Sequence, residues 1–483
     1  MTPTDEQLAI IAAARETSDN LLVSALAGAA KTSTLVLLAE ALPEISILCL
    51  SFNKKIATEM ARRMPNNCEV RTLNSLGHRV WAETSGRRLR IDSGKTYSIV
   101  KEYIESLPAD ERGPLYENMG ELMKLVSFGK QCGYVPDNFS SALPYKPRPL
   151  MSDDEFFEHI DQELSPQEQD LVIHTTNLSI KLALENAVLD YDDQIFMPTI
   201  FHANFPRFPL ILVDEAQDLS SLNHAMLAKL VKKRLIAVGD ANQAIYGFRG
   251  AHENSMTLLR ERFSMKTFTL SISFRCARKI VEHARWKAPN MKYPDWAAEG
   301  SITTLVPWKA SDLAEDAMII CRNNAPLFST AIRLIKNGRS AELDGKDVVN
   351  YLIKIMKKFG SSDLPRVSVL DNIDRWLAEQ KDKTKERAWS GLEDRAECMR
   401  IFAREASDLG GAVAYATHIT QLHSPLKLMT GHKSKGLESP TVYFLDEKLV
   451  RKTEQDPNLR YVIQTRAKLN LIYINSEDFR DEV

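Results

Sequence analysis

The stretch from residue 210 to residue 251 reads LILVDEAQDLSSLNHAMLAKLVKKRLIAVGDANQAIYGFRGA. An apolar run ends in Asp214 and Glu215, a helical stretch follows, and a second apolar run ends in Gly239 and Asp240. A strand–helix–strand pattern with polar groups at both strand ends predicts an open parallel sheet. In such a sheet the carboxyl ends of the strands line a ligand crevice. Paired acids there suit a metal-bound phosphate and an attacking water. The alternative interpretation is that Asp214 and Glu215 are two surface acids that follow a core strand and have no function in catalysis.

The composition is typical of a soluble globular protein, with 44% apolar and 26% charged residues. At 483 residues the chain is too long for one hydrophobic core, so several domains are expected. We expect a cytoplasmic protein, because the sequence has neither an apolar run long enough for a membrane span nor a secretory signal. The six cysteines are scattered without a CxxC pair, which argues against a zinc site. The net charge of −2 gives no support for a nucleic-acid binder, so any basic surface must be local.

A second signal lies between residues 20 and 40, where an apolar strand, a small-residue loop and a helical stretch follow one another. This is the context of a phosphate-binding loop, in which Lys31 reaches the terminal phosphates and Thr32 ligates magnesium. The strict pattern GxxxxGK[ST] requires glycine at positions 25 and 30, and both are alanine here. Because Ala30 stands just before a helix, we expect a negative φ there, so that a glycine at this position would be neutral or slightly harmful. The candidate nucleotide-binding residues of the loop are Gly28, Ala29, Ala30, Lys31, Thr32 and Ser33.

The DEAQD and GDxxQxIYxFRGA motifs together resemble the nucleotide-hydrolysis core of superfamily 1 DNA helicases of the UvrD, Rep and PcrA type. Further motifs similar to those of the family follow in the family's order. They are FNKK at 52–55, RTLNSLGH at 71–78, YDDQI at 191–195, FRC at 274–276, TGHKSKGLE at 430–438 and YVIQTRA at 461–467. The resemblance covers nearly the whole chain except two insertions.

The resemblance implies a role for each matched residue of the nucleotide site. Gln7 would read the adenine edge, Phe274 would stack on adenine and Glu438 would hold the ribose hydroxyl. Thr32 and Asp214 would hold Mg²⁺. The residues implied in catalysis are Lys31 and Arg275 on the phosphates, Glu215 on the attacking water, Gln243 as the γ-phosphate sensor and Arg466 as an arginine finger.

The resemblance also implies a DNA path across both domains. Aromatic faces accept any base, so Tyr246 and Phe248 are candidate stacking platforms, with packing at a domain interface as the alternative. The residues implied in DNA binding are Phe52, Asn53, Lys54, Thr72, Asn74, Ser75, Tyr246, Phe248, Arg249, Thr430, His432 and Lys435. The basic segment YKPRP at 145–149 lies outside these motifs and is interpreted as a linker.

The expected fold is α/β, with two RecA-like P-loop NTPase domains that have parallel sheets and each carry a mainly helical insertion. ATP would lie in the cleft between them. The first domain is expected over residues 1–85 and 191–265, with a helical insertion over 86–190. The second is expected over residues 266–359 and 425–483, with a short insertion over 360–424.

The predicted function is an ATP-dependent helicase that moves 3′→5′ on single-stranded DNA, with ATP and Mg²⁺ as cofactors and single/double-strand junctions as further partners. The first alternative is a DNA-stimulated ATPase that translocates or displaces proteins with little unwinding. The short second insertion favours it, because family members usually carry a larger one. The second alternative is a non-catalytic nucleotide- and DNA-binding module, which Ala25 and Ala30 suggest. The joint retention of the catalytic residues argues against it.

Overall fold

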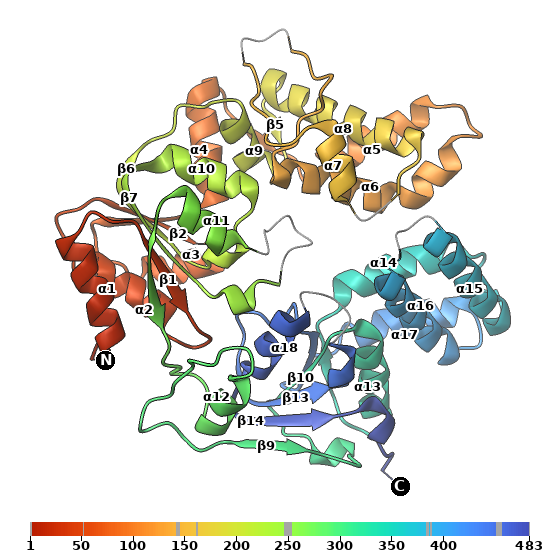
Figure 1. Cartoon of the computed structure of the whole chain (residues 1–483). Helices are drawn as coiled ribbons and strands as arrows, with labels where there is room; N and C mark the ends of the chain where they lie inside the picture. The colour runs from red at the N-terminus through yellow and green to blue at the C-terminus, as the bar shows by residue number, and fades with distance from the viewer. Residues whose placement is uncertain are drawn as a thin grey trace. The chain divides into compact units, whose positions relative to one another are not determined.

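The computed structural model describes residues 2–51, 53–141, 145–160, 163–245, 254–382, 386, 389–450 and 456–482. Backbone contacts divide the chain into two units (Figure 1). The first consists of residues 1–25, 30–160 and 164–270, and the second of residues 26–29, 161–163 and 271–483. Each unit contains one six-stranded sheet with flanking helices, so the predicted α/β class is confirmed. No helix in the described part of the chain is long and apolar enough to cross a membrane.

The first unit is built on a sheet in the order β3-β2-β6-β7-β1-β8, in which every neighbouring pair is parallel. Its central strands are near-continuous apolar runs because helices cover both faces of a parallel sheet. Parallel strands also bring all their carboxyl ends to one edge. The strands are β1 (Leu21–Ala25), β2 (Ile47–Ser51), β3 (Cys68–Thr72), β6 (Phe208–Val213), β7 (Val231–Gly239) and β8 (Lys266–Leu270). The helices around them are α1 (Asp5–Glu16), α2 (Lys31–Glu40), α3 (Lys54–Ala61), α4 (Leu73–Ser85), α9 (Asp193–Ile200), α10 (Ser221–Leu230) and α11 (Ser255–Arg262).

The edge strand β8 lies in the first unit, whereas the sequence predicts that the second α/β domain begins at residue 266. β8 pairs in parallel with β1, with Leu21 opposite Lys266 and Ala25 opposite Leu270. The backbone hydrogen bonds of this pairing place the strand in the first sheet. An apolar pattern predicts that a segment is a strand, but it does not predict which of two sheets the strand joins.

A mainly helical region separates α4 from α9. Its elements are β4 (Arg90–Ile91), α5 (Lys95–Ser106), α6 (Arg112–Cys132), α7 (Asp153–His159), α8 (Pro166–Glu185) and β5 (Val188–Leu189). The start of α8 is fixed locally, because Ser165 and Glu168 form a capping box and Pro166 takes the first helical position. The helices enclose a hydrophobic cluster of their own, which includes Leu122, Phe156 and Leu171.

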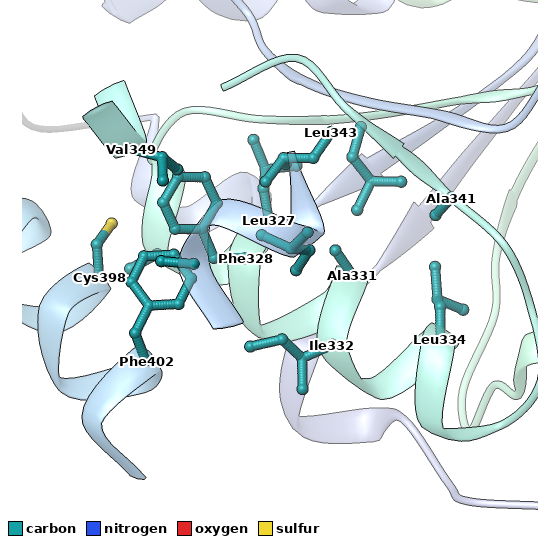
Figure 2. Close-up of a cluster of buried hydrophobic side chains, with 14 of the residues drawn as sticks. Leu327, Phe328, Ala331, Ile332, Leu334, Ala341, Leu343, Val349, Cys398 and Phe402 are labelled. Atoms are coloured by element: carbon teal, nitrogen blue, oxygen red, sulfur yellow. The ribbon is translucent and has the colours of Figure 1, made fainter. Parts of the chain in front are cut away.

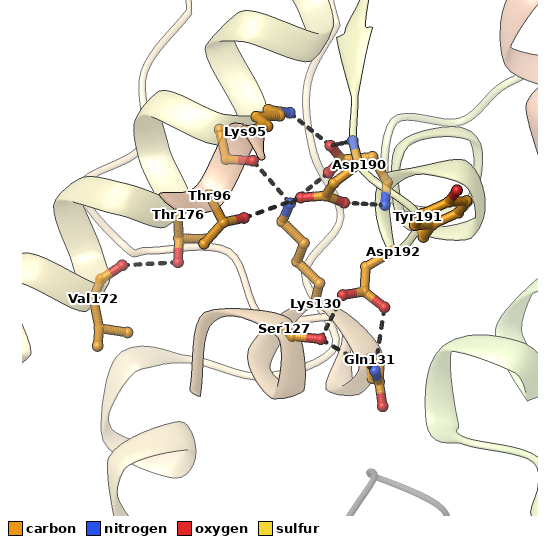
Figure 3. A network of polar contacts seen from close by, with 12 residues as sticks. Lys95, Thr96, Ser127, Lys130, Gln131, Val172, Thr176, Asp190, Tyr191 and Asp192 are labelled. Carbon is orange, nitrogen blue, oxygen red and sulfur yellow. Dashed lines mark hydrogen bonds and ion pairs between the residues drawn. The ribbon is translucent and has the colours of Figure 1, made fainter. Parts of the chain in front are cut away.

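A buried ionic network joins this helical region to the YDDQI segment that returns to the sheet (Figure 3). Lys130 Nζ on α6 lies 2.5 Å from Asp190 Oδ2 and 2.7 Å from Asp193 Oδ1. Lys95 Nζ on α5 lies 2.6 Å from Asp193 Oδ2, and the side chains of both lysines and of Asp193 are at most 1% exposed. Burial favours a lower pKa for Lys130, but Asp190 and Asp193 raise the pKa above its ordinary value. Lys130 is therefore charged, and its ion pairs hold α6 to the core.

We expect Lys130→Met to reduce the free energy of unfolding by about 3–5 kcal/mol, because it leaves two buried carboxylates with one cation. The matched control is Lys124→Met on the same helix, where the lysine side chain is 62% exposed and pairs with Glu121. Removing that exposed pair should cost about 1 kcal/mol or less. Urea unfolding followed by circular dichroism measures both, and equal small losses would contradict the assigned role of the network.

The second unit is built on a sheet in the order β11-β12-β10-β13-β14-β9, again with parallel neighbours throughout. The strands are β9 (Ser301–Thr304), β10 (Met318–Cys321), β11 (Glu342–Leu343), β12 (Lys427–Thr430), β13 (Ser439–Leu445) and β14 (Ala467–Ile474). The helices are α12 (Arg278–Ala284), α13 (Asn324–Lys336), α14 (Lys346–Met356), α15 (Arg366–Asp382), α16 (Trp389–Arg404), α17 (Leu409–Ile419) and α18 (Asp456–Gln464).

The main hydrophobic cluster of the second unit joins the sheet to α13 and to the helices between α14 and β12 (Figure 2). Phe328 on α13 and Phe402 on α16 are fully buried, with ring centroids 5.3 Å apart. Val369 and Ile373 of α15 belong to the same cluster. The segment expected as a short insertion therefore shares its core with the α/β unit.

Candidate nucleotide and DNA site

The loop between β1 and α2 is held in place by a close approach at Gly28 and by hydrogen bonds from its backbone. Gly28 has a φ of +74°, and a Cβ there would lie 2.6 Å from Ser273 Oγ and 2.7 Å from Arg275 Cβ. The Gly28 carbonyl accepts a hydrogen bond from the Phe274 amide at 2.9 Å, and the Ala27 amide donates to the Tyr461 hydroxyl at 3.0 Å. Only glycine fits at position 28, and the loop contacts two of the motifs found in the sequence.

Ala30 adopts the left-handed conformation, with φ 54° and ψ 40°. The expectation of a negative φ at this position is wrong. Ala30 is the residue immediately before α2 and has no side-chain cap, so the chain turns sharply into the helix there. Alanine pays roughly 1–2 kcal/mol for this backbone conformation.

We therefore expect Ala30→Gly to raise the free energy of unfolding. The relief of about 1–2 kcal/mol of backbone strain exceeds the loss of about 0.4–1 kcal/mol from the greater freedom of glycine in the unfolded chain. Ala29→Gly is the matched control, because Ala29 is not among the residues with positive φ and should only lose stability. Thermal unfolding compares the two variants with the parent. A lower free energy of unfolding for Ala30→Gly would contradict the backbone strain assigned to Ala30.

Lys31 faces three carboxylates at the carboxyl ends of β6 and β7. Its Nζ lies 2.7 Å from Glu215 Oε2. Burial favours a lower pKa for Lys31, but Glu215, Asp214 and Asp240 together raise the pKa above its ordinary value. Asp214 and Asp240 are 4% and 0% exposed. Burial raises the pKa of both, to about 7 for Asp214, where Glu215 adds to the rise and Lys31 opposes it. Three acids thus face one lysine, and a divalent cation would balance the charge.

Thr32 and Asp214 fit a magnesium ion. The Thr32 side chain is hydrogen-bonded to the Asp214 carboxylate, which brings a hydroxyl and a carboxylate oxygen together. Mg²⁺ prefers oxygen ligands and is often held by one or two protein oxygens together with substrate phosphates. Ser33 Oγ instead accepts a hydrogen bond from Arg63 Nη2 at 3.0 Å. Of these two hydroxyls, that of Thr32 is the one beside the acids.

Glu215 is directed toward Lys31 by an unusual backbone turn. Its φ of 52° and ψ of 45° are left-handed, a conformation that costs on the order of 1–3 kcal/mol outside glycine and is concentrated at functional sites. Gln217 contacts the same carboxylate oxygen as Lys31, with Nε2 donating to Glu215 Oε2 at 2.6 Å. The Glu215 carboxylate is 23% exposed and so remains accessible to water.

The Gln217 side chain links the two strand ends of the site. Its Oε1 accepts the Asp240 amide at 2.9 Å, and Gln243 Nε2 donates to Asp240 Oδ2 at 2.7 Å. A Cβ at Gly239 would lie 2.6 Å from Gln217 Oε1, so glycine is required there. Gln217 is not among the residues predicted for the site. The sequence predicts Asp240 at a strand end that lines the crevice, because it follows β7 as Asp214 follows β6, but gives it no role.

Gln7 is used locally by α1. Its Oε1 accepts the Thr4 amide at 3.0 Å within a capping box, and its Nε2 donates to Thr34 Oγ1 on α2 at 3.0 Å. Gln7 therefore ties α1 to the helix of the phosphate-binding loop. Its predicted contact with adenine stays a prediction.

In the second unit, Arg275 and Glu438 form an ion pair, with Arg275 Nε 2.7 Å from Glu438 Oε2. Lys468 Nζ lies 3.2 Å from the other carboxylate oxygen. Burial favours a higher pKa for Glu438, but Arg275 and Lys468 lower the pKa below its ordinary value. The ring of Phe274 lies 6.4 Å from that of Trp296, which is 70% exposed. Three residues predicted at the nucleotide thus lie together.

Arg466 is 1% exposed and is bound within its own unit. Its Nε donates to the Val462 carbonyl at 2.9 Å, and its Nη1 donates to the Leu437 carbonyl at 3.2 Å. The guanidinium thereby connects the end of α18 to the residue before Glu438. Its predicted function as an arginine finger stays a prediction, and the structure adds a structural role.

Of the predicted DNA-binding residues of the first unit that the structure describes, Asn53 and Lys54 follow β2, Thr72 ends β3, and Asn74 and Ser75 lie in the first turn of α4. They lie at the same sheet edge as Lys31. Asn53 Oδ1 caps α3 by accepting the Ile56 amide at 2.9 Å, and Thr72 Oγ1 caps α4 by accepting the Ser75 amide at 3.2 Å. Lys54 is exposed, and Asn74 Nδ2 donates to the Tyr191 carbonyl at 2.8 Å. Phe52, Tyr246, Phe248 and Arg249 lie outside the described residues.

Among the predicted DNA-binding residues of the second unit, Thr430 is the last residue of β12, and His432 and Lys435 lie on the turn that follows. The Thr430 carbonyl accepts the Ser434 amide at 3.0 Å. A Cβ at Gly431 would lie 2.7 Å from Leu459 Cδ1, so the turn packs closely against α18. The turn ends at Glu438, and His432 and Lys435 therefore share one loop with a residue predicted at the nucleotide.

Comparison with known proteins supplies an independent observation. The model of the UvrD/REP helicase N-terminal domain matches residues 4–264, more than half of the chain. F-box DNA helicase protein 1 of Schizosaccharomyces pombe is 24% identical over 305 residues, 60% of this chain and 33% of that protein. The putative ATP-dependent DNA helicase YjcD of Bacillus subtilis is also 24% identical over 305 residues, 56% of this chain and 37% of that protein. The ATP-dependent DNA helicase Rep of Escherichia coli is 32% identical over 108 residues, 20% of this chain and 16% of that protein. The first two matches span about a third of the relatives' own length.

Proposed function

This chain belongs to the UvrD/REP helicase family, and on that premise we propose that it hydrolyses ATP to move 3′→5′ along single-stranded DNA. The observation that carries the proposal is the set of groups around Lys31. A partly buried lysine, three acids and two glutamines meet at one sheet edge, next to a loop that has the sequence context of a phosphate site. Direction, strand specificity and the use of Mg²⁺ belong to the proposal.

Each side chain of this set has a defined task in hydrolysis. Lys31 exchanges Glu215 for phosphate oxygens and neutralises their charge. Thr32 and Asp214 would hold Mg²⁺, which would offset negative charge on the phosphates. Glu215, released from Lys31, orients the attacking water. Gln243, which is hydrogen-bonded to Asp240, responds to the γ-phosphate.

The second unit is proposed to bind the other end of the same nucleotide. Phe274 stacks on the base, Arg275 binds a phosphate and Glu438 accepts the ribose hydroxyl. Arg275 and Glu438 must separate to do so, since they neutralise each other in the ion pair. That both units act on one ATP rests on the family likeness.

A DNA-stimulated ATPase with little unwinding remains the second candidate. The observation that favours it is the compact segment between α14 and β12, whose helices α15, α16 and α17 pack into the second unit. A strand-displacement assay on duplexes with 3′ or 5′ single-stranded tails separates the two candidates. Displacement from 3′ tails alone supports the helicase, and ATP hydrolysis without displacement on either substrate supports the second candidate.

A further inference from the structure

A cavity of about 490 Å³ opens on the first unit, away from the nucleotide site. Arg207, one of its lining residues, immediately precedes β6, whereas Asp214 immediately follows that strand. Six residues of extended chain span about 20 Å, so the cavity lies at the opposite edge of the sheet. The lining residues are Arg148, Leu150, Thr199, Ile200, His202, Ala203, Asn204, Phe205, Arg207, Ala225, Ala228, Lys229 and Arg262.

The charge of this cavity has one sign. Five of its residues are basic, namely Arg148, His202, Arg207, Lys229 and Arg262, and among the described lining residues there is no aspartate or glutamate. Burial lowers the pKa of Lys229, and Arg148 lowers it further. Burial likewise lowers the pKa of His202, with Lys229 and Arg148 adding to the effect. Arg148 therefore lies close enough to Lys229 and His202 for its charge to disfavour their protonated forms, an effect that a bound anion would offset.

The cavity also holds a buried polar group without a partner. Thr199 is 3% exposed, and its hydroxyl forms no hydrogen bond with any residue in the part of the chain that the structure describes. An unsatisfied buried hydroxyl costs about 1–3 kcal/mol. His202, three residues later, has a left-handed φ of 52°. Because the Thr199 oxygen is itself buried, the unsatisfied hydroxyl and the left-handed His202 show that this wall of the cavity is strained, whereas the exposed basic side chains provide the contacts for a ligand.

We propose that this basic cavity binds backbone phosphates of the DNA strand. The proposal deepens the proposed function and rests on it. Phosphate oxygens supply the negative charge that the basic residues of the cavity lack. A Mg²⁺-bound nucleotide fits less well, because no described lining residue offers a carboxylate for the metal.

The shape of the cavity agrees with a strand that passes over it. Arg148, His202, Arg207 and Arg262 are exposed at the rim, while Thr199, Ala203, Phe205 and Ala225 form a buried floor. Exposed guanidinium groups contact phosphates without reading bases. Arg148 belongs to the YKPRP segment interpreted as a linker, and its amide bonds to the Ile200 carbonyl at 3.0 Å, which fixes that segment beside the cavity. The contact adds DNA affinity independent of sequence and leaves hydrolysis unchanged.

The test is the salt dependence of oligonucleotide binding by the Arg207→Glu/Lys229→Glu double variant. Fluorescence anisotropy with a single-stranded oligonucleotide gives the association constant between 50 and 200 mM salt. Each phosphate that the variant no longer neutralises lowers the slope of log K against log salt by about 0.7 for a single strand. We expect at least a tenfold loss of affinity at low salt, a slope smaller by about 0.7–1.4, and unchanged ATP hydrolysis without DNA.

The control is Lys357→Glu/Lys358→Glu, which changes the charge equally at two exposed lysines of the second unit and should bind DNA as the parent does. Arg207→Gln/Lys229→Gln is the second variant, because it removes two positive charges without adding negative ones. It should weaken DNA binding several-fold and replaces the charge-reversal variant if that variant fails to fold. Unchanged affinity and slope in both cavity variants would overturn the inference.

Inorganic tripolyphosphate separates the two sources of phosphate. If the cavity variants lose thermal stabilisation by tripolyphosphate but keep the DNA affinity of the parent, the ligand is a small phosphate compound and the backbone assignment falls. If the parent chain itself binds no oligonucleotide, the proposed function fails. If the parent binds the oligonucleotide and the cavity variants bind it equally well, the cavity assignment is rejected and the proposed function stands.

Discussion

Glu215→Gln is expected to slow ATP hydrolysis by about 10²–10⁴-fold, the range for removal of a general base. Glu215 is the acid of the cluster with an accessible carboxylate, and a strained turn, Lys31 and Gln217 fix its position. Glutamine keeps the shape but cannot accept the proton of the attacking water. The Glu215 carboxylate faces Lys31 and raises the pKa of Asp214. Because the substitution removes this negative charge, nucleotide affinity should not fall.

Phosphate release under saturating ATP, together with titration of a fluorescent ATP analogue, measures the two effects separately. Asp218→Asn is the matched control, since Asp218 lies in the same DEAQD segment, is 6% exposed and is not among the charges that raise the pKa of Lys31. It should change the hydrolysis rate by less than about tenfold. Equal rates in Glu215→Gln and the parent would remove Glu215 from the reaction.

Arg466→Ala is expected to lower kcat by about 10³-fold, on the scale of known arginine fingers. A finger contributes mainly in the transition state, where charge spreads over the γ-phosphoryl oxygens. Its guanidinium is bound to the Val462 and Leu437 carbonyls, so it must exchange them for phosphate oxygens. The loss should therefore appear in kcat, with little change in nucleotide affinity.

The structural role of Arg466 has to be measured beside the catalytic one. Loss of its hydrogen bonds to the Val462 and Leu437 carbonyls should cost about 0.5–1.5 kcal/mol each. Arg333→Ala is the control, because Arg333 also binds a carbonyl of the second unit, that of Ser476, but lies outside the proposed site. It should lower stability without lowering kcat. If Arg466→Ala behaves in the same way, Arg466 is only a structural residue.

Sequence predicted best where one physical cause dominates. The apolar runs before Asp214 and Asp240 and after Asn20 are strands of one parallel sheet, because a strand buried on both faces has to be apolar. Polar residues at those strand ends then meet at one edge, and Lys31 and Glu215 form an ion pair across it. The order of the strands, by contrast, could not be predicted from any local pattern.

The details that were not predicted from the sequence depend on backbone conformation and side-chain contacts, which the spacing of residues in a motif does not encode. The φ of Ala30 is set by how the loop turns into α2. Gln217 enters the site because Glu215 is left-handed, which turns the chain back so that Gln217 reaches the Asp240 amide. Gln7 matches the family position, but its amide is shared between Thr4 and Thr34.

The most direct test of the central claim is the ATPase rate of the parent chain and of Lys31→Ala, each with and without single-stranded DNA. Lys31 is the cation that the site supplies to the phosphates, and alanine cannot replace it. The parent should hydrolyse ATP and do so faster when DNA is added, whereas Lys31→Ala should show neither activity and still bind DNA. Identical background rates in both proteins, with and without DNA, would contradict the claim and indicate a nucleotide- and DNA-binding module without catalysis.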